Sequence, residues 1–259
     1  MRGRALGLAL WAALATPPTM PASAGPAADA FAGGDWARAA ELGARGTTAD
    51  ERIAQARALS VLATYEARER DRAEALLEEA IAAAAAAVEL EPRNARALAE
   101  RAIVTGYLSK LKRSPREARA ARRDAEAALH LDPGLALAHA VLGGWHLEAV
   151  ATLGAFLART TLGARMAEGE RHFARAHALK PDSALFPVFH AFALLALGPE
   201  RGPDAQALLE RAAAARPADA YERRVQAQGR QVLGLLARGE VARARALARA
   251  LSPLGRIER

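Results

Sequence analysis

The sequence predicts an all-α fold, a solenoid of about four to five antiparallel helical hairpins. Composition is the first reason, because 71 Ala and 33 Arg stand among 259 residues, against 5% aromatics. Ala and Arg are strong helix formers, whereas aromatic and β-branched residues favour strands. The second reason is a proline-ended motif that occurs four times along the chain. The third is a series of helix-start signals between those prolines.

Helix-start signals place several of the expected helices. Thr48-x-x-Glu51 is a capping box, in which a hydroxyl and a carboxylate satisfy free N–H groups of the first turn. Ser114-Pro115 supplies an N-cap followed by proline at the first helical position, and Asp219-x-x-Glu222 resembles a capping box. We expect helices at residues 27–32, 35–42, 48–69, 71–90, 94–111, 115–130, 134–150, 167–179, 183–197, 203–215, 219–237 and 239–251.

Residues 150–166 interrupt this order as an insertion between two expected helices. We interpret the segment as an extension of the preceding helix followed by a helical return. Its sequence leaves open whether the return is helical or a loop, because it carries no clear start or stop signal.

Four helical runs end at a proline with a small residue at a fixed distance before it. Proline ends a helix because it lacks the N–H donor and clashes with the preceding turn. The prolines are spaced 41, 48 and 36 residues apart, and an alanine stands five residues before each. Alanine there lets the helix approach its neighbours closely. The prolines are Pro92, Pro133, Pro181 and Pro217, and the alanines are Ala87, Ala128, Ala176 and Ala212.

The third of these units has the most specific pattern. Gly169, Phe173, Ala176 and Pro181 follow the spacing small-x3-Phe-x2-Ala-x4-Pro, and Leu142-Gly143 stands in the helix before them. This pattern resembles the tetratricopeptide repeat (TPR), a unit of 34 residues with two antiparallel helices. The resemblance implies a partial repeat at residues 25–47, a TPR-like domain at 48–252 and a C-terminal tail at 253–259. Arg101-Ala102 and Gln226-Ala227 depart from the repeat, which has Leu-Gly there.

A narrower resemblance covers about residues 95–237. The segment from Leu142 to Glu148 reads Leu-Gly-Gly-Trp-His-x-Glu, and an extended helix follows it. This motif is similar to that of the regulator-of-microtubule-dynamics group and its bacterial relatives. The resemblance implies a TPR-like helical domain without an established enzymatic activity. Microtubule binding is not carried over, because the N-terminus predicts export.

The N-terminus is typical of a signal peptide. Arg2 and Arg4 precede an uninterrupted apolar run at residues 5–15, and Ala22-Ser23-Ala24 fits the small-x-small cleavage pattern. Eleven residues are too few to span a bilayer, which requires about 20 in a helix. We therefore expect cleavage after Ala24 and a periplasmic or secreted protein with no transmembrane segment in the mature chain. A buried N-terminal helix is the alternative.

The TPR resemblance implies a concave groove lined by the first helix of each hairpin. Such a groove would be apolar in the middle, with arginines at both ends, and would suit a peptide or protein partner with apolar anchors and acidic flanks. For Val188 and Phe192 the alternative is that they belong to the core. The candidate groove residues are Arg96, Ile103, Tyr107, Leu137, Gly144, Glu148, Val188, Phe192, Tyr221, Arg224 and Gln228.

Two other functions remain open. A basic run at residues 110–123 could bind an anionic polymer or lipid, although its alternative is a solvated helix face. No aromatic residues interleave with it, so nucleic acid is not expected as a partner. His139, His146 and Glu148 could serve a metal-dependent enzyme, although an interior histidine more often packs without a metal.

No cofactor or catalytic activity is predicted. The chain contains no cysteine and no nucleophile elbow, phosphate-binding loop or HExxH motif. Its net charge of +7 would suit an anionic partner, but most arginines alternate with acidic residues, as on solvated helix faces. The sequence does not indicate the oligomeric state. We therefore predict a non-catalytic scaffold of the cell envelope that binds other proteins.

Overall fold

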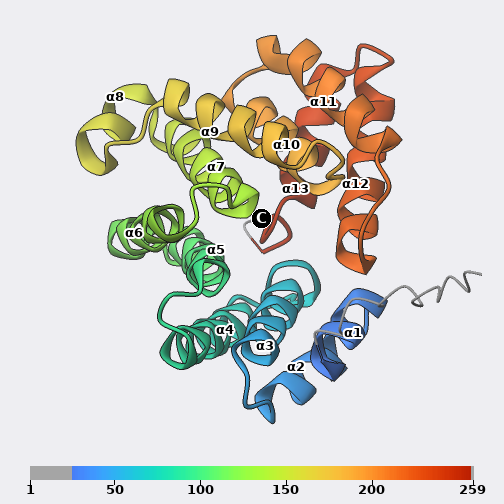
Figure 1. The fold of residues 1–259 in the computed structure, drawn as a ribbon. Coiled ribbons are helices and arrows are strands. Elements are labelled where there is room, and N and C mark those ends of the chain that lie inside the picture. Colours follow the sequence, from blue (N-terminus) through green and yellow to red (C-terminus); the bar gives the residue numbers. More distant parts are fainter. Residues whose placement is uncertain (1–24, 258–259) are drawn as a thin grey trace, which may run out of the picture.

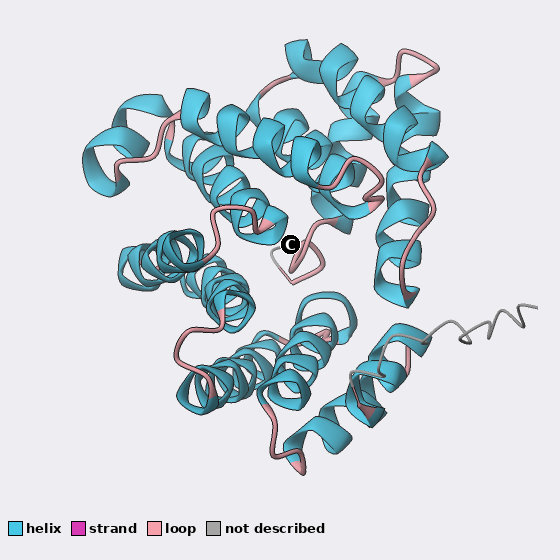
Figure 2. Ribbon diagram, in the orientation of Figure 1, coloured by secondary structure: helices cyan, strands magenta, loops and turns pink. Residues whose placement is uncertain are grey.

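The computed structural model describes residues 25–257, and this part of the chain consists entirely of helices, turns and loops (Figures 1 and 2). The predicted all-α solenoid of antiparallel hairpins is confirmed. The hairpins number six within these residues, rather than four to five, because the short N-terminal segment forms a hairpin of its own. The predicted signal peptide lies outside the described residues.

Each hairpin pairs an inner helix with an outer helix that runs back along it. The first three pairs are α1 (Pro26–Gly33) with α2 (Trp36–Ala44), α3 (Ala49–Val61) with α4 (Arg70–Leu90), and α5 (Ala95–Lys112) with α6 (Pro115–Leu131). The last three are α7 (Ala136–Leu153) with α9 (Met166–Leu179), α10 (Leu185–Leu197) with α11 (Gly202–Ala214), and α12 (Ala220–Leu236) with α13 (Val241–Leu251).

The inner helices form a closed ring. Each of α1, α3, α5, α7, α10 and α12 contacts the next, and α12 returns to contact α1 (Figure 1). The outer helices α2, α4, α6, α9 and α11 each fill the space between two inner helices. The chain is therefore a solenoid whose first and last hairpins meet, instead of an open superhelix.

Most helix starts lie where the capping signals predict them. Both hydrogen bonds of the capping box at Thr48 and Glu51 are present. The Glu51 N–H donates to the Thr48 hydroxyl, and the Thr48 N–H donates to the Glu51 carboxylate. Asp219 accepts a hydrogen bond from the Glu222 N–H at 2.8 Å. At Ser114 the helix begins as predicted, but the hydroxyl binds the Glu117 carboxylate instead of a backbone N–H.

The helix predicted at residues 48–69 is shorter than expected. Its α-helical part ends at Val61, and residues Leu62–Glu66 form a π-helical turn. The Ala67 N–H donates to the Leu62 carbonyl at 2.8 Å across this turn. A π turn leaves no simple sequence signal, because it depends on packing around the helix rather than on a capping residue.

The four alanines that precede the prolines are all buried, with at most 1% of their surface exposed. Glycines have the same function where α7 crosses α9. A Cβ atom on Gly143 would lie 2.7 Å from the Phe173 ring, and one on Gly169 would lie 2.6 Å from the Leu147 side chain. Small residues thus set the close approach of inner and outer helices, as the sequence pattern predicts.

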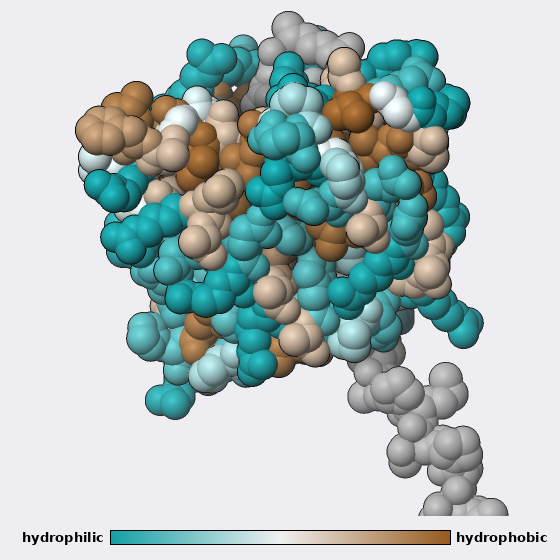
Figure 3. Space-filling view, turned by 90° about the horizontal axis from the view of Figure 1, so that it is seen from above, coloured by the Kyte–Doolittle hydropathy of each residue, from teal (hydrophilic) through white to brown (hydrophobic). Residues whose placement is uncertain are grey.

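The insertion at residues 150–166 is largely helical. Helix α7 extends to Leu153, and α8 (Ala155–Leu157) with a π-helical turn (Ala158–Leu162) forms the return. The return is attached to α6, because Arg119 and Arg122 donate to the carbonyls of Thr161 and Leu162. Its tip is apolar and open to solvent, with Phe156 72% exposed, and Figure 3 shows an apolar group at this corner of the molecule.

None of the helices between Gly25 and Ile257 has the length and apolar character needed to cross a membrane.

Candidate functional site

The candidate groove residues all come from four inner helices. Helix α5 carries Arg96, Ile103 and Tyr107, and α7 carries Leu137, Gly144 and Glu148. Helix α10 carries Val188 and Phe192, and α12 carries Tyr221, Arg224 and Gln228. The predicted set therefore lies in the inner layer, but its members differ in how far a partner could reach them.

Val188, Phe192 and Gln228 are buried, so the alternative assignment to the core describes the first two. Val188 has no exposed surface and Phe192 has 7%. Both belong to the main core cluster between α10, α11 and α12. Their burial follows from the position of α10, which is covered by α7, α11, α12 and α13 together. These side chains support the inner face but do not form it.

Three tyrosines gather on the inner face where the ring closes. The rings of Tyr65 and Tyr221 lie 6.1 Å apart between centroids, and Phe31 of α1 lies 6.2 Å from Tyr221. Burial raises the pKa of Tyr221 to about 12, while hydrogen bonds with the hydroxyls of Tyr65 and Tyr107 oppose the shift. Only Tyr107 and Tyr221 belonged to the predicted set. Tyr65 and Phe31 were missed, because they lie in helices to which the repeat pattern assigned no groove position.

Arg57 connects three inner helices at the same closure. Its guanidinium lies 3.4 Å from the Asp219 carboxylate of α12 and 3.5 Å from the Glu100 carboxylate of α5. It also stacks over the Phe31 ring, 4.0 Å from the centroid. Burial raises the pKa of Glu100, and the charge of Arg57 opposes this shift. Removing one partner from a buried ion pair destabilises a protein, because the other charge is left buried without compensation.

Arg224, a predicted groove residue, makes a second closing contact. Its guanidinium lies 3.4 Å from the Glu66 carboxylate and stacks over the rings of Trp36 and Tyr65, about 5 Å from each centroid. Arg224 is therefore occupied within the chain. The arginine expected to receive an acidic partner instead holds the last hairpin against the first.

The C-terminal residues after α13 turn into the inner side of the ring (Figure 1). The Leu254 N–H donates to the Thr64 carbonyl at 3.0 Å. This carbonyl lies in the last turn of its helix, where carbonyls have no partner within the helix. The Leu254 side chain is fully buried in the cluster that contains Leu59, Leu108 and Leu111. Its φ of +66° is a left-handed conformation that a bulky residue adopts only when its surroundings impose it.

The histidines on α7 do not form the predicted site with Glu148. Glu148 is two residues from His146, so it lies on a different face of the helix, where its carboxylate is 3.7 Å from the Lys110 ammonium. His139 instead approaches His172 of α9, with 3.0 Å between their Nδ1 atoms. Within residues 25–257, no three His, Cys, Asp or Glu side chains are grouped so that they could hold a metal ion.

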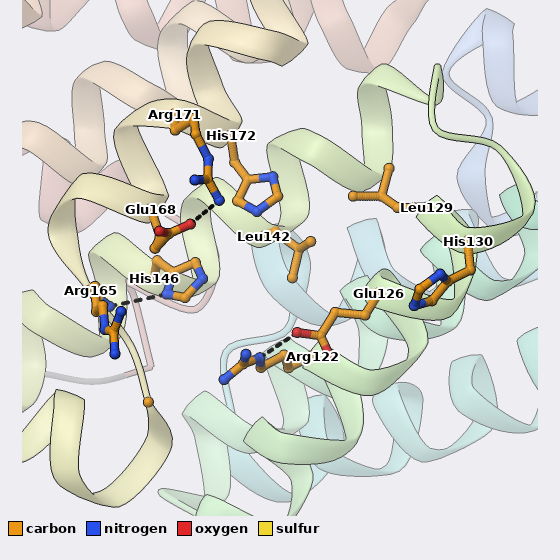
Figure 4. Close-up of a pocket in the computed structure, with 11 residues that line it drawn as sticks. Arg122, Glu126, Leu129, His130, Leu142, His146, Arg165, Glu168, Arg171 and His172 are labelled. Carbon is orange, nitrogen blue, oxygen red and sulfur yellow. Dashed lines mark hydrogen bonds and ion pairs between the residues drawn. The ribbon is translucent and has the colours of Figure 1, made fainter.

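A pocket of about 670 Å³ lies between α6, α7, α9 and the segment that joins the insertion to α9 (Figure 4). We call it the histidine pocket, because the buried ring of His146 and the ring of His172 form one of its walls. This pocket could not be predicted from the sequence, since its residues come from three helices and an insertion. Its lining residues are Arg122, Glu126, Leu129, His130, Leu142, His146, Gly163, Arg165, Glu168, Arg171 and His172.

The basic run at residues 110–123 is partly neutralised by neighbouring carboxylates. Lys110 pairs with Glu148, and Lys112 lies 2.6 Å from Glu74 and 3.3 Å from Glu78. Arg122 pairs with Glu126 at 2.7 Å. These contacts are those of a solvated, ion-paired helix surface, and they leave fewer free cations than the sequence alone indicates.

The fold and the inner face define a helical-hairpin solenoid that closes on itself and holds its own C-terminal residues inside. The chain belongs to the family described as regulator of microtubule dynamics protein 1-3, whose family model matches residues 49–237. This match covers 189 of the 259 residues and includes α3 to α12 but not α1, α2 or α13. A search of the curated proteins finds no match. Family membership suggests a role of the protein-interaction type.

Proposed function

We propose that the chain is a non-catalytic interaction module that binds a segment of another protein on its inner face. The observation that carries this proposal is the position of the C-terminal residues. They lie on that face as a short peptide would, with one backbone hydrogen bond and one fully buried apolar side chain. A face that accommodates these residues has the chemistry to accept a similar segment from a partner.

The chemistry of this face defines what it accepts. The Thr64 carbonyl takes a backbone N–H, and the cluster around Leu59 and Leu108 takes an aliphatic side chain. Tyr107 is partly exposed beside them. We therefore propose a partner segment with a leucine-like anchor that replaces Leu254. Binding by displacement weakens the apparent affinity, because the partner competes with a segment tethered at high local concentration.

The proposal includes export of the mature chain to the periplasm or beyond the cell, where the partner is a protein of the envelope. It rests on the basic start, the apolar run and the Ala22-Ser23-Ala24 site of the sequence. Intact-mass measurement on chain purified from the periplasm tests it. A mature chain that begins at Gly25 supports export, and a full-length chain confined to the cytoplasm contradicts it.

The binding proposal is tested with a chain that ends at Leu251 and a labelled peptide of residues 252–259. We expect the peptide to bind the shortened chain and not the full chain, whose inner face is already occupied. A peptide with Leu254→Asp is the matched control and should not bind, because an aspartate cannot enter an apolar site without a partner.

Circular dichroism first establishes that the shortened chain keeps its helical content and a cooperative unfolding transition. If it does and the peptide does not bind, the inner face is not a peptide-binding surface. If the shortened chain is unfolded, full-length Leu254→Asp replaces it as the acceptor, since this variant releases the segment without removing it. Failure of the folded Leu254→Asp chain to bind the peptide equally contradicts the proposal.

A further inference from the structure

The histidine pocket lies between the outer helices α6 and α9, beside the inner helix α7, and none of the residues used for the proposed function lines it. In Figure 4, Arg122 and Glu126 of α6 lie across the pocket from His146, Glu168 and His172 of α7 and α9. Leu142 and Leu129 provide apolar surface between these two walls. The pocket therefore combines charged groups, three imidazoles and an apolar floor, and the proposed function uses none of them.

The hydrogen bonds of His139 fix the proton positions of His172. The His139 Nε2 atom lies 3.2 Å from the Pro133 carbonyl, which can only accept, so this nitrogen carries the proton. The Nδ1 atom of the neutral His139 ring then accepts, and the His172 Nδ1–H donates to it across 3.0 Å. As long as His172 is neutral, its Nε2 atom carries a lone pair and no proton.

His146 has the opposite arrangement. Its Nδ1 atom accepts the backbone N–H of Arg165 at 3.1 Å, so the proton of the neutral ring is on Nε2. The ring is fixed edge-on to Trp145, with 5.0 Å between centroids, and lies nearly parallel to His172, with 6.1 Å between centroids. Burial lowers the pKa values of both histidines, which supports the neutral rings. One wall of the pocket thus holds a fixed N–H donor beside a fixed acceptor.

The charges of the pocket favour an anion. The Arg122 and Arg171 guanidiniums are paired with Glu126 and Glu168. The Arg165 side chain also lines the pocket and is exposed, and it has no carboxylate within salt-bridge distance among the described residues. Three arginines against two glutamates leave one positive charge in the lining.

We propose that the histidine pocket binds a small hydroxylated organic anion, a sugar acid or a sugar phosphate. The carboxylate or phosphate pairs with Arg165, whose fork of N–H donors matches either group. A ligand hydroxyl donates to the His172 Nε2 lone pair, and the His146 Nε2–H donates to a ligand oxygen. A bare anion such as sulfate has no proton for His172 and would place an oxygen against that lone pair.

The proton positions are tested first, by long-range ¹H–¹⁵N NMR of the mature chain. We expect the Nε2–H form of His146 and the Nδ1–H form of His172, assigned with His146→Asn and His172→Asn variants. The opposite form at either histidine overturns the proposal, because the donor and acceptor would then not stand side by side.

Titration of the mature chain with glucuronate and with glucose 6-phosphate then tests binding and distinguishes the two ligand sources. We expect one of these probes to shift the His146 and His172 signals in a saturable manner, while sodium sulfate and neutral glucose do not. Sulfate that shifts both histidines equally well overturns the proposal in favour of a simple anion site. The proposal also fails if neither sugar anion shifts the histidines.

Arg165→Gln should weaken binding about tenfold or more, as expected for the loss of a hydrogen bond to a charged group. This variant keeps the backbone N–H that positions His146. Arg123→Gln is the matched control, since it removes the same charge from an exposed residue of α6 that does not line the pocket. Equal weakening by both variants overturns the proposal, because it would show a diffuse attraction to the basic surface.

Discussion

At the scale of single residues, the buried imidazole of His146 has the clearest consequence. Only 5% of this residue is exposed. Burial, and then the charge of Arg122, lower its pKa from 6.5 to about 4. The folded chain therefore binds fewer protons at this site than the unfolded chain when the pH lies between these two values. The contribution to stability is complete above pH 6.5 and is lost as the pH falls toward 4.

The His146→Asn variant tests this linkage. The Asn Oδ1 atom can accept the Arg165 N–H in place of Nδ1, but the side chain does not titrate. We expect the free energy of unfolding of the wild type to fall more steeply than that of the variant between pH 6.5 and 4. The difference in slope should reach at most about 1.4 kcal/mol per pH unit. Urea unfolding at several pH values measures it, and parallel profiles for the two proteins contradict the prediction.

The histidines also show what sequence alone could predict at this scale. The seven-residue spacing of His139 and His146 indicates that both lie on one face of a helix, and in the structure both rings pack near His172 of α9. Which ring nitrogen carries the proton could not be predicted, because it depends on the Pro133 carbonyl and the Arg165 N–H. Glu148 was grouped with them by proximity in sequence, although two residues along a helix change the face.

At the scale of secondary-structure elements, the crossing of α7 and α9 depends on which of two adjacent glycines faces the partner. Gly143 faces the Phe173 ring, whereas a Cβ on Gly144 would meet nothing within 4 Å. We therefore expect Gly143→Ala to destabilise the chain by about 1–3 kcal/mol through overpacking. Gly144→Ala should stabilise it by about 0.5–1 kcal/mol, since alanine is the better helix former.

Thermal unfolding of the two variants and the wild type at one pH measures these changes in stability. Each variant serves as the control for the other. Their opposite signs are the critical result, because both substitutions add the same methyl group to the same helix. Stabilisation by Gly143→Ala would mean that α7 and α9 do not cross as closely as the structure shows.

The elements themselves were largely predictable, because their signals are local. Thr48, Asp219 and the buried alanines each act within one turn or one hairpin. The π-helical turn at Leu62–Glu66 and the helical return after Leu153 have no such local signal. At both places the chain adopts a conformation that neighbouring helices stabilise, so residue preferences within the segment do not determine it.

At the scale of the whole molecule, the closed ring could not be predicted from the repeat pattern. A repeat defines only how each hairpin packs on the next one, so it is equally compatible with an open superhelix. Closure depends on contacts such as Arg57 with Asp219, which are separated by 162 positions. Closure also changes the interpretation of two predicted groove residues, because Tyr221 and Arg224 contact the first two hairpins instead of lining an open groove.

Substitution of Arg57 tests how much its ion pairs with Glu100 and Asp219 contribute to the stability of the closed ring. Arg57→Ala leaves the Glu100 carboxylate buried without its cation. We expect a loss of about 2–3 kcal/mol, less than the 3–5 kcal/mol typical of a fully buried pair, because the Arg57 side chain is 24% exposed. Adding Glu100→Gln should restore part of the loss, since it removes the uncompensated charge, and a double-mutant cycle on unfolding free energies gives the coupling.

Hydrogen exchange on the same variants shows whether the loss opens the ring. In Arg57→Ala the amides of α1 and α2 should exchange faster relative to those of α10, because Phe31 of α1 loses the guanidinium that packs on its ring, and α3 loses its ion pair with Asp219. Arg230→Ala is the control on α12, since this exposed arginine donates only to the nearby Ala213 carbonyl. If α1, α2 and α10 lose protection equally, Arg57 stabilises the chain without closing it, and contacts such as the packing of Tyr221 against Phe31 then hold the first and last hairpins together.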